Sequence, residues 1–232
     1  MSVAIDYGIC NAGESVYSLY SWINGYDARE KLSSFSKEEQ YNLGVVSGKY
    51  LKEIHSIPAD NNIETWEERF NKKIDIKIDR YKKCGIVLEN DDKIISYLEE
   101  NRELLKNRPQ CFQHGDYHIG NMIITGNNEL GIIDFNRFDY GDPWEEFNRI
   151  VWSAEVSPEF ASGYINGYFE NKVPNDFFKL MLLYISSNQI STVGWAKSFG
   201  EKEIAIAINQ TKRVIEWYDN YKSYIPSWYM KY

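Results

Sequence analysis

The stretch HGDYHIGN, residues 114–121, decides the fold of this chain together with IDFN, residues 133–136. Two short apolar runs, 122–125 and 130–133, lie between these motifs on either side of the polar turn GNNE. Short apolar runs that flank Gly and Asn predict a β-hairpin. Because a hairpin returns the chain to its starting point, we expect Asn121 and Asp134 to meet at one end of it.

An Asp, an Asn five residues later and a second Asp after a hairpin match the needs of phosphoryl transfer. This reaction uses one group to accept the proton of the attacking hydroxyl, and oxygen ligands for the Mg²⁺ ion on the phosphates. Asp116 is therefore the candidate catalytic base. Asn121 and Asp134 are the candidate metal ligands, and through the metal they would bind the nucleotide. A lone Asp of this kind would more often cap a turn.

The two histidines of the first motif are expected to support the loop. His114 and His118 are four residues apart, as in some metal sites, but no third His or Cys lies nearby and the loop is not expected to be helical. We expect their ring nitrogens to bond backbone or carboxylate groups.

The ordered motifs resemble the protein-kinase catalytic loop, HRDxxxxN followed by DFG. Gly115 stands in place of the Arg, and Asn136 in place of the last Gly. The ordered motifs are more similar to those of the aminoglycoside phosphotransferase family of kinase-like enzymes. They are HGDxHxGN, then IDF, then the tripeptide Gly-Asp-Pro at residues 141–143. The resemblance covers roughly residue 15 to the C-terminus. Ile119 is a departure, because many members have Pro there.

This resemblance implies an α+β, protein-kinase-like fold. Residues 24–232 would form the mainly helical C-terminal lobe with the catalytic loop and the substrate site. Residues 1–23 would be a short β-hairpin remnant of the N-terminal lobe, with the connector between the lobes. Asp142 resembles the family's structural carboxylate, and we expect it to cap a helix near Trp144 with Pro143 in the first position.

The resemblance also implies an activity. The chain would transfer the terminal phosphate of ATP or GTP to a hydroxyl of a small molecule, with Mg²⁺ as cofactor. An aminoglycoside-like amino sugar, as in antibiotic resistance, is the first expected acceptor. Choline, homoserine or another amino alcohol is the rival acceptor, and a non-catalytic pseudokinase or binding module is the alternative from a different class.

Apolar patterning and turn residues predict the remaining elements. Residues 3–9 and 16–23 are expected to pair as a hairpin, ended by a turn at Asn24-Gly25. Ser36 and Glu39 form a capping-box pattern that opens a helix to about residue 56. Further helices are expected over residues 64–84, 91–107, 144–154, 157–170, 175–193 and 201–222.

Two groups of residues are expected to bind the substrates. In a kinase-like fold, Ser21, Trp22 and Ile23 fall in the connector, where backbone groups would bond the adenine edge. Carboxylates downstream of Asp134 are candidates for a cationic acceptor, although each could equally be a solvated charge on a helix face. These candidates are Asp139, Glu145 and Glu146, with Glu155 and Glu159 beyond them.

The part of a kinase that holds the phosphates has no counterpart in the sequence. A Gly-rich loop, a strand Lys and a helix Glu would precede the connector, but the first basic residue is Arg29. The run GICNAGES, residues 8–15, nearly matches a phosphate-binding loop, yet Glu14 stands where the Lys belongs. Three explanations stay open: upstream sequence supplies the missing small lobe, another chain supplies it, or the chain is a degenerate gene product. We favour the loss of an upstream part of a functional kinase.

Composition limits the partners. The chain has 232 residues and a formal charge of −8, without a basic stretch typical of nucleic-acid binding. Its three cysteines are widely spaced, and no apolar run approaches the roughly 18 residues of a membrane span. The sequence therefore predicts a cytoplasmic protein with a small-molecule partner, and neither nucleic-acid nor membrane binding. An acidic surface would attract a cationic or hydroxylated substrate.

Overall fold

The computed structural model describes residues 2–60 and 62–231, and it confirms the α+β, kinase-like fold class. The helices are α1 (Ala28–Lys31), α2 (Lys37–Ile54), α3 (Trp66–Cys84), α4 (Asp91–Glu100), α5 (Ile150–Val156), α6 (Pro158–Tyr168), α7 (Asn175–Ala196) and α8 (Glu201–Trp217). The strands are β1 (Ala4–Cys10), β2 (Ser15–Tyr20), β3 (Gly25–Asp27), β4 (Cys111–Gln113), β5 (Met122–Thr125), β6 (Leu130–Ile132) and β7 (Asp139–Gly141).

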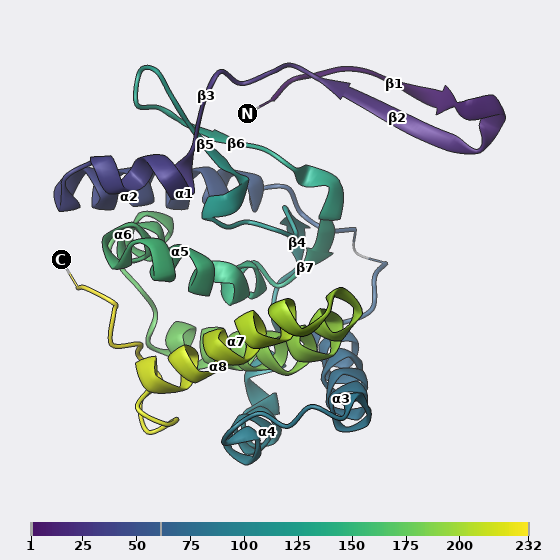
Figure 1. Ribbon diagram of the computed structural model, residues 1–232, viewed down its shortest axis with the longest axis vertical. Helices are drawn as coiled ribbons and strands as arrows, with labels where there is room; N and C mark the ends of the chain where they lie inside the picture. Colours follow the sequence, from purple (N-terminus) through teal and green to yellow (C-terminus); the bar gives the residue numbers. More distant parts are fainter. Residues whose placement is uncertain (1, 61, 232) are drawn as a thin grey trace.

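The first two strands form the expected hairpin, which projects from the helical body (Figure 1). They pair antiparallel from Ala4↔Tyr20 to Cys10↔Ser15. Apolar side chains on both strands face solvent, with Tyr7 83% and Val16 81% exposed. The hairpin therefore keeps its shape through backbone pairing, and its apolar surface is left uncovered by the described residues around it.

A second sheet joins the start of the body to the predicted motif hairpin. Strand β3 pairs with β5, and β5 pairs with β6 in the register Met122↔Ile132. The expected turn at Asn24-Gly25 is wrong, because Gly25 pairs with Thr125 and the chain stays extended into β3. The hairpin predicted between the two motifs is confirmed.

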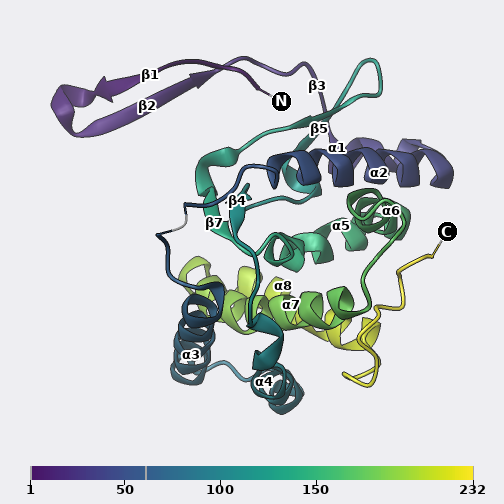
Figure 2. The same ribbon diagram turned by 180° about the vertical axis from the view of Figure 1, so that it is seen from behind.

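The helical body is stacked from α2 through α5 and α6 to α7 and α8, with α3 and α4 at the far end (Figures 1 and 2). Helix α2 begins as predicted, since Ser36 and Glu39 form a capping box. Its backbone lies directly against α6: a Cβ added at Gly44 would sit 2.1 Å from the carbonyl oxygen of Phe160. Glycine at this contact lets the two helices approach closely enough to enclose the core.

Two predicted helices end or begin elsewhere in the structure. The helix expected over 91–107 stops at Glu100, because Asn101 leaves the helical conformation and bonds the carbonyl of Tyr97 through its side chain. The helix expected over 144–154 is divided into a 3₁₀ turn, η6 (Glu145–Arg149), and α5 from Ile150. Among the described residues, no helix has the length and apolar character to cross a membrane.

Candidate active site

The catalytic loop follows β4, and its glycine is required by geometry. Gly115 has φ +81°, a conformation that side chains with a Cβ rarely adopt. A Cβ at this position would also lie 1.8 Å from the carbonyl oxygen of Arg137. The glycine of the HGD motif therefore lets the segment after Asp134 pass directly beneath the loop.

His114 fixes the start of the loop from a fully buried position. Its Nε2 donates to the carbonyl oxygen of Ile133 at 2.9 Å, so Nδ1 is left to accept the N–H of Asp116 at 3.2 Å. Burial lowers the pKa of His114, which favours this neutral ring. The contacts match the bracing role expected from the sequence, because one imidazole joins the loop to the strand that leads to Asp134.

Asp116 lies among positive and hydrogen-bonding side chains. Its carboxylate is 2.9 Å from a terminal nitrogen of Arg149, 3.3 Å from Nε2 of His118 and 3.7 Å from Nε of Arg137. Burial raises the pKa of Asp116, but the hydrogen bond from His118 and the charges of Arg149 and Arg137 outweigh burial and lower the pKa to about 2. Asp116 is therefore ionised at neutral pH and ready to accept a hydrogen bond from a hydroxyl.

His118 orients its ring through the following turn. The Nδ1 atom accepts the N–H of Gly120 at 3.0 Å, which leaves Nε2 to carry the hydrogen that faces Asp116. Both histidines thus accept backbone N–H groups of the loop in the structure.

Asn121 and Asp134 lie at the same end of the β5–β6 hairpin. Asn121 directly precedes β5, and its carbonyl accepts the N–H of Ile133 at 3.1 Å. Its side-chain nitrogen donates to the carbonyl of Asp116 at 2.9 Å, which leaves the amide oxygen as its possible cation ligand. Asp134 is exposed, with φ +68°. The hairpin therefore brings Asn121 and Asp134 to the same end, where the Asn121 side chain bonds the backbone of Asp116.

Asp142 is fully buried and holds several elements together. Arg108 donates to both of its oxygens, at 2.7 and 2.9 Å, and Tyr184 donates its hydroxyl at 2.5 Å. The N–H of Trp144 also donates to it at 3.0 Å. Asp142 was expected to cap an α-helix near Trp144. It caps a short turn instead, because the chain forms the 3₁₀ turn η6 before α5 begins.

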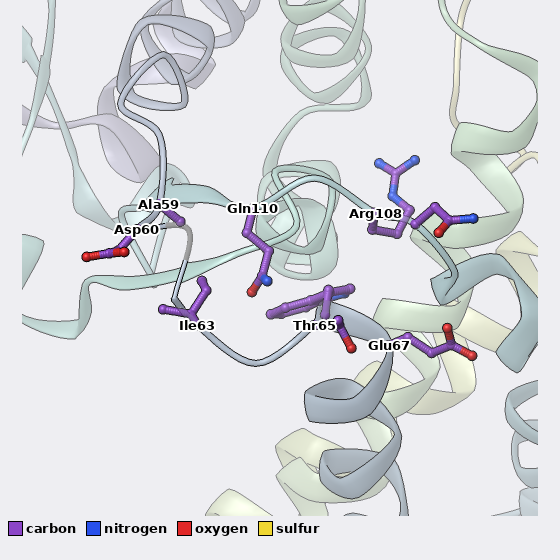
Figure 3. Close-up of a pocket in the computed structure, with 9 residues that line it drawn as sticks. Ala59, Asp60, Ile63, Thr65, Glu67, Arg108 and Gln110 are labelled. Atoms are coloured by element: carbon purple, nitrogen blue, oxygen red, sulfur yellow. The ribbon is translucent and has the colours of Figure 1, made fainter.

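Arg108 also borders a cavity of about 300 Å³, with residues 59–60 and 63–67 on one side and 107–110 on the other (Figure 3). Asp60, Trp66 and Glu67 also line this cavity. Arg108 is held beside this cavity by its two hydrogen bonds to Asp142.

Glu146, a candidate for acceptor binding in the sequence, is buried beneath the catalytic loop in the structure. Its side chain is 2% exposed, and it accepts the N–H of Gly115 at 3.0 Å and that of Tyr117 at 3.4 Å. It anchors the catalytic loop from below. The apolar spacing of Trp144, Phe147 and Ile150 was the signal that this turn faces the core.

The other candidate acceptor carboxylates already have partners. Asp139 pairs with Arg69 and lies 3.8 Å from Lys73. Glu145 accepts a hydrogen bond from Gln113 at 3.2 Å. The two more distant carboxylates are paired as well, Glu155 with Arg213 at 2.9 Å and Glu159 with Lys37 at 2.8 Å.

Sequence reasoning missed Arg137 and Arg149, the two arginines beside Asp116. Neither belongs to a motif, and they come from different segments, the turn after Asp134 and the end of η6. The only sequence signal for these two arginines was their position downstream of the IDF motif.

The connector residues link the projecting hairpin to the body. Ser21 bonds Val3 twice, through its N–H and through its hydroxyl, both at 2.8 Å. Trp22 is 86% exposed, whereas the Ile23 side chain lies against Gly131 of β6. The contact of Ser21, Trp22 and Ile23 with the adenine edge stays a prediction. The structure shows only that these residues lie between the β1–β2 hairpin and β3.

A model of the phosphotransferase enzyme family matches residues 3–180. The chain therefore belongs to this family of kinase-like phosphotransferases, which act on hydroxyl groups, and the resemblance seen in its motifs is confirmed. A search of curated proteins found no significant match.

Solved structures of similar fold include three informative examples. The gentamicin complex of APH(2'')-IIa has 20% identity and a TM-score of 0.61, over 89% of this chain and 73% of that one. The GDP complex of a mutant aminoglycoside 2'-phosphotransferase-IIIa has 13% identity and a TM-score of 0.71, over 95% and 76%. A choline/ethanolamine kinase family protein from Mesorhizobium loti has 12% identity and a TM-score of 0.66, over 95% and 74%. At these identities, the likeness shows a common fold.

Proposed function

We propose that this chain carries the catalytic centre for Mg²⁺-dependent transfer of the terminal phosphate of ATP or GTP to a small-molecule hydroxyl. One observation carries the proposal: Asp116, Asn121 and Asp134 are assembled at one end of the β5–β6 hairpin. The side chain of Asn121 bonds the backbone of Asp116, and the backbone of Asn121 bonds the residue before Asp134.

The side chains present fit a magnesium ion. Mg²⁺ prefers hard oxygen ligands and takes few from the protein, since phosphate and water oxygens complete its shell. The amide oxygen of Asn121 and the exposed carboxylate of Asp134 would hold it. When bound, the ion would neutralise charge on the nucleotide phosphates.

Asp116 would orient the acceptor hydroxyl and take its proton late in the reaction. Its pKa of about 2 makes it a weak base, so its contribution is mainly the alignment of the attacking oxygen. His118 and Arg149 keep the carboxylate in place, and Arg149 also puts a positive charge where negative charge would accumulate during transfer.

The small lobe is a second part of the proposal. We infer that upstream sequence or another chain covers the β1–β2 hairpin and supplies the phosphate-facing groups. The exposed apolar side chains of that hairpin support this, Val3, Ile5 and Ile9 being 66%, 61% and 74% exposed. Placement in the cytoplasm is proposed from the three unpaired cysteines, which suit a reducing compartment.

Amino sugars and amino alcohols are one class of acceptor to include in the test. The neighbours named for gentamicin binding and for choline or ethanolamine phosphorylation suggest these classes. The alternative is a non-catalytic pseudokinase or binding module. The complete set of Asp116, Asn121 and Asp134 favours an active enzyme.

The test is release of nucleoside diphosphate from ATP or GTP with Mg²⁺, across acceptor panels. The chain is assayed beside a version extended upstream. We expect acceptor-dependent release that is lost in Asp116→Asn and retained in Asp92→Asn, an exposed Asp on α4. A folded protein that neither binds Mg·ATP nor releases diphosphate in either length would contradict the proposed activity.

A further inference from the structure

The acceptor side of the proposed kinase site is rich in cations, and this inference rests on that proposed function. The carboxylates expected to attract a cationic acceptor are paired or buried, as shown above for Asp139, Glu145 and Glu146. A polyamine would have to displace Arg69 from Asp139 before it could bind there, whereas Lys73 lies farther from Asp139, at 3.8 Å. The exchange of one ion pair for another at a partly exposed site gains little free energy.

Two arginines bring positive charge to the reacting carboxylate itself. The Arg149 side chain is 21% exposed and lies 2.9 Å from Asp116, while the Arg137 side chain is 58% exposed at 3.7 Å. Both come from the segment that follows Asp134. An acceptor approaching Asp116 therefore meets guanidinium groups, which bind carboxylates and phosphates through paired hydrogen bonds.

Helix α3 extends this positive region away from Asp116. Lys73 and Lys77 are one turn apart on it, with Nζ of Lys73 5.3 Å from the ring centre of Trp66 and Nζ of Lys77 3.0 Å from the hydroxyl of Ser187. Burial raises the pKa of Glu145, whereas the charges of Lys73, Lys77 and Arg149 lower it. Lys73 also lies 3.8 Å from Asp139, which pairs with Gln113 of β4 directly before the catalytic loop, so α3 borders the segment that leads to Asp116.

A cavity of about 510 Å³ continues from Lys77 between α3 and the C-terminal half of α7. Four cations line it, namely Lys77, Arg80, Lys83 and Lys197, and none of its described lining residues carries a carboxylate. Ile190 and Trp195 form an apolar wall, and Trp195 is 54% exposed. The cavity lining is therefore positive although the whole chain has a formal net charge of −8.

We propose that the acceptor is an anionic hydroxyl compound, whose carboxylate or phosphate group is held by Lys73 and Lys77 while its hydroxyl lies at Asp116. Burial lowers the pKa of Lys77 to about 8, so this lysine is still largely protonated at neutral pH. The cavity beyond Lys77 accommodates the remainder of the molecule, with Trp195 as its apolar contact.

The experiment compares acceptors that share a skeleton and differ in charge. Gluconate is paired with glucosamine and glucose, and glycerate with 3-amino-1,2-propanediol and glycerol. Glycerol 3-phosphate is compared with glycerate to show whether the site recognises a phosphate or a carboxylate. We expect kcat/KM to be at least about tenfold higher for the anionic member of each set, as one well-formed charge contact provides.

Matched lysine variants of α3 test the assigned residues. Lys73→Met and Lys77→Met should each raise KM for the anionic acceptor about tenfold, with little change in kcat or in KM for ATP. Lys82→Met is the control, because Lys82 is exposed on the same helix and does not line the cavity. Lys73→Glu should move the preference toward the amino member of each set.

Three results would overturn the inference. Preferential phosphorylation of the amino compounds would leave the kinase function intact and show that the charge assignment is wrong. A rise in KM for ATP alone would show that the lysines serve the nucleotide phosphates. Absence of both diphosphate release and Mg·ATP binding would remove the kinase function on which the inference rests, and direct measurement of nucleotide binding distinguishes this case.

Discussion

The carboxylate of Glu146 accepts the backbone N–H of Gly115 at 3.0 Å, so a residue of the 3₁₀ turn η6 holds the catalytic loop from beneath. The same carboxylate reaches the N–H of Tyr117 at 3.4 Å. Asp116 lies between these two anchored residues. The position of the proposed catalytic carboxylate is therefore fixed through the backbone on both of its sides.

Replacement of Glu146 should loosen the loop and destabilise the fold. In Glu146→Ala, two buried N–H groups lose their acceptor, and each such loss typically costs about 1–3 kcal/mol. Denaturant titration should show a lower free energy of unfolding, with activity reduced further at a temperature where the protein stays folded. Glu100→Ala, an exposed position at the end of α4, is the control, and equal stability of the two variants would contradict the anchoring role.

Gly115→Ala should impair both stability and activity. The new Cβ would meet the carbonyl oxygen of Arg137 at 1.8 Å and would force a left-handed backbone on alanine, a strain of about 1–3 kcal/mol. Urea titration and phosphotransfer assays measure the two effects. Gly126→Ala is matched to it, because a Cβ there has nothing within 4 Å and its φ is not positive. A Gly115 variant that behaves like the Gly126 variant would rule out the steric constraint.

Asp116 should make stability depend on pH in the acid range. Its pKa falls from the model-compound value of 3.8 to about 2, so its ion pairs stabilise the fold above pH 4 and lose that contribution as pH falls toward 2. The contribution is about 2 kcal/mol. In Asp116→Asn, the free energy of unfolding should change less between pH 4 and pH 2, as measured by urea titration at each pH. Asp92→Asn should keep the wild-type slope.

The contact between α2 and α6 should tolerate no side chain. In Gly44→Ala, the methyl group would lie 2.1 Å from the carbonyl oxygen of Phe160, so the helices must separate. Such overpacking typically costs about 1–3 kcal/mol. Gly194→Ala on α7 is the contrasting variant, since its nearest neighbour is 3.9 Å away and alanine favours a helix. Thermal unfolding should show opposite shifts in Tm, and a neutral Gly44 variant would contradict the close contact.

Local patterns were sufficient for much of the fold. Ser36 and Glu39 specify a helix start through bonds to their own turn, and the apolar runs around residues 126–129 specify a hairpin. Where the local signals conflicted with tertiary pairing, the prediction was wrong. Asn24-Gly25 has turn chemistry, yet pairing with β5 draws Gly25 into a strand.

The sequence by itself determined the family and indicated the proposed chemistry, because the spacing of Asp116, Asn121 and Asp134 is measured along the chain through a short hairpin. Tertiary structure alone decided which other charges meet them. Glu145 and Glu146 are adjacent in sequence, but only Glu146 turns beneath the loop. Arg149 reaches Asp116 from 33 residues away because η6 packs under the same loop. Packing of distant segments sets these contacts, and no local pattern encodes it.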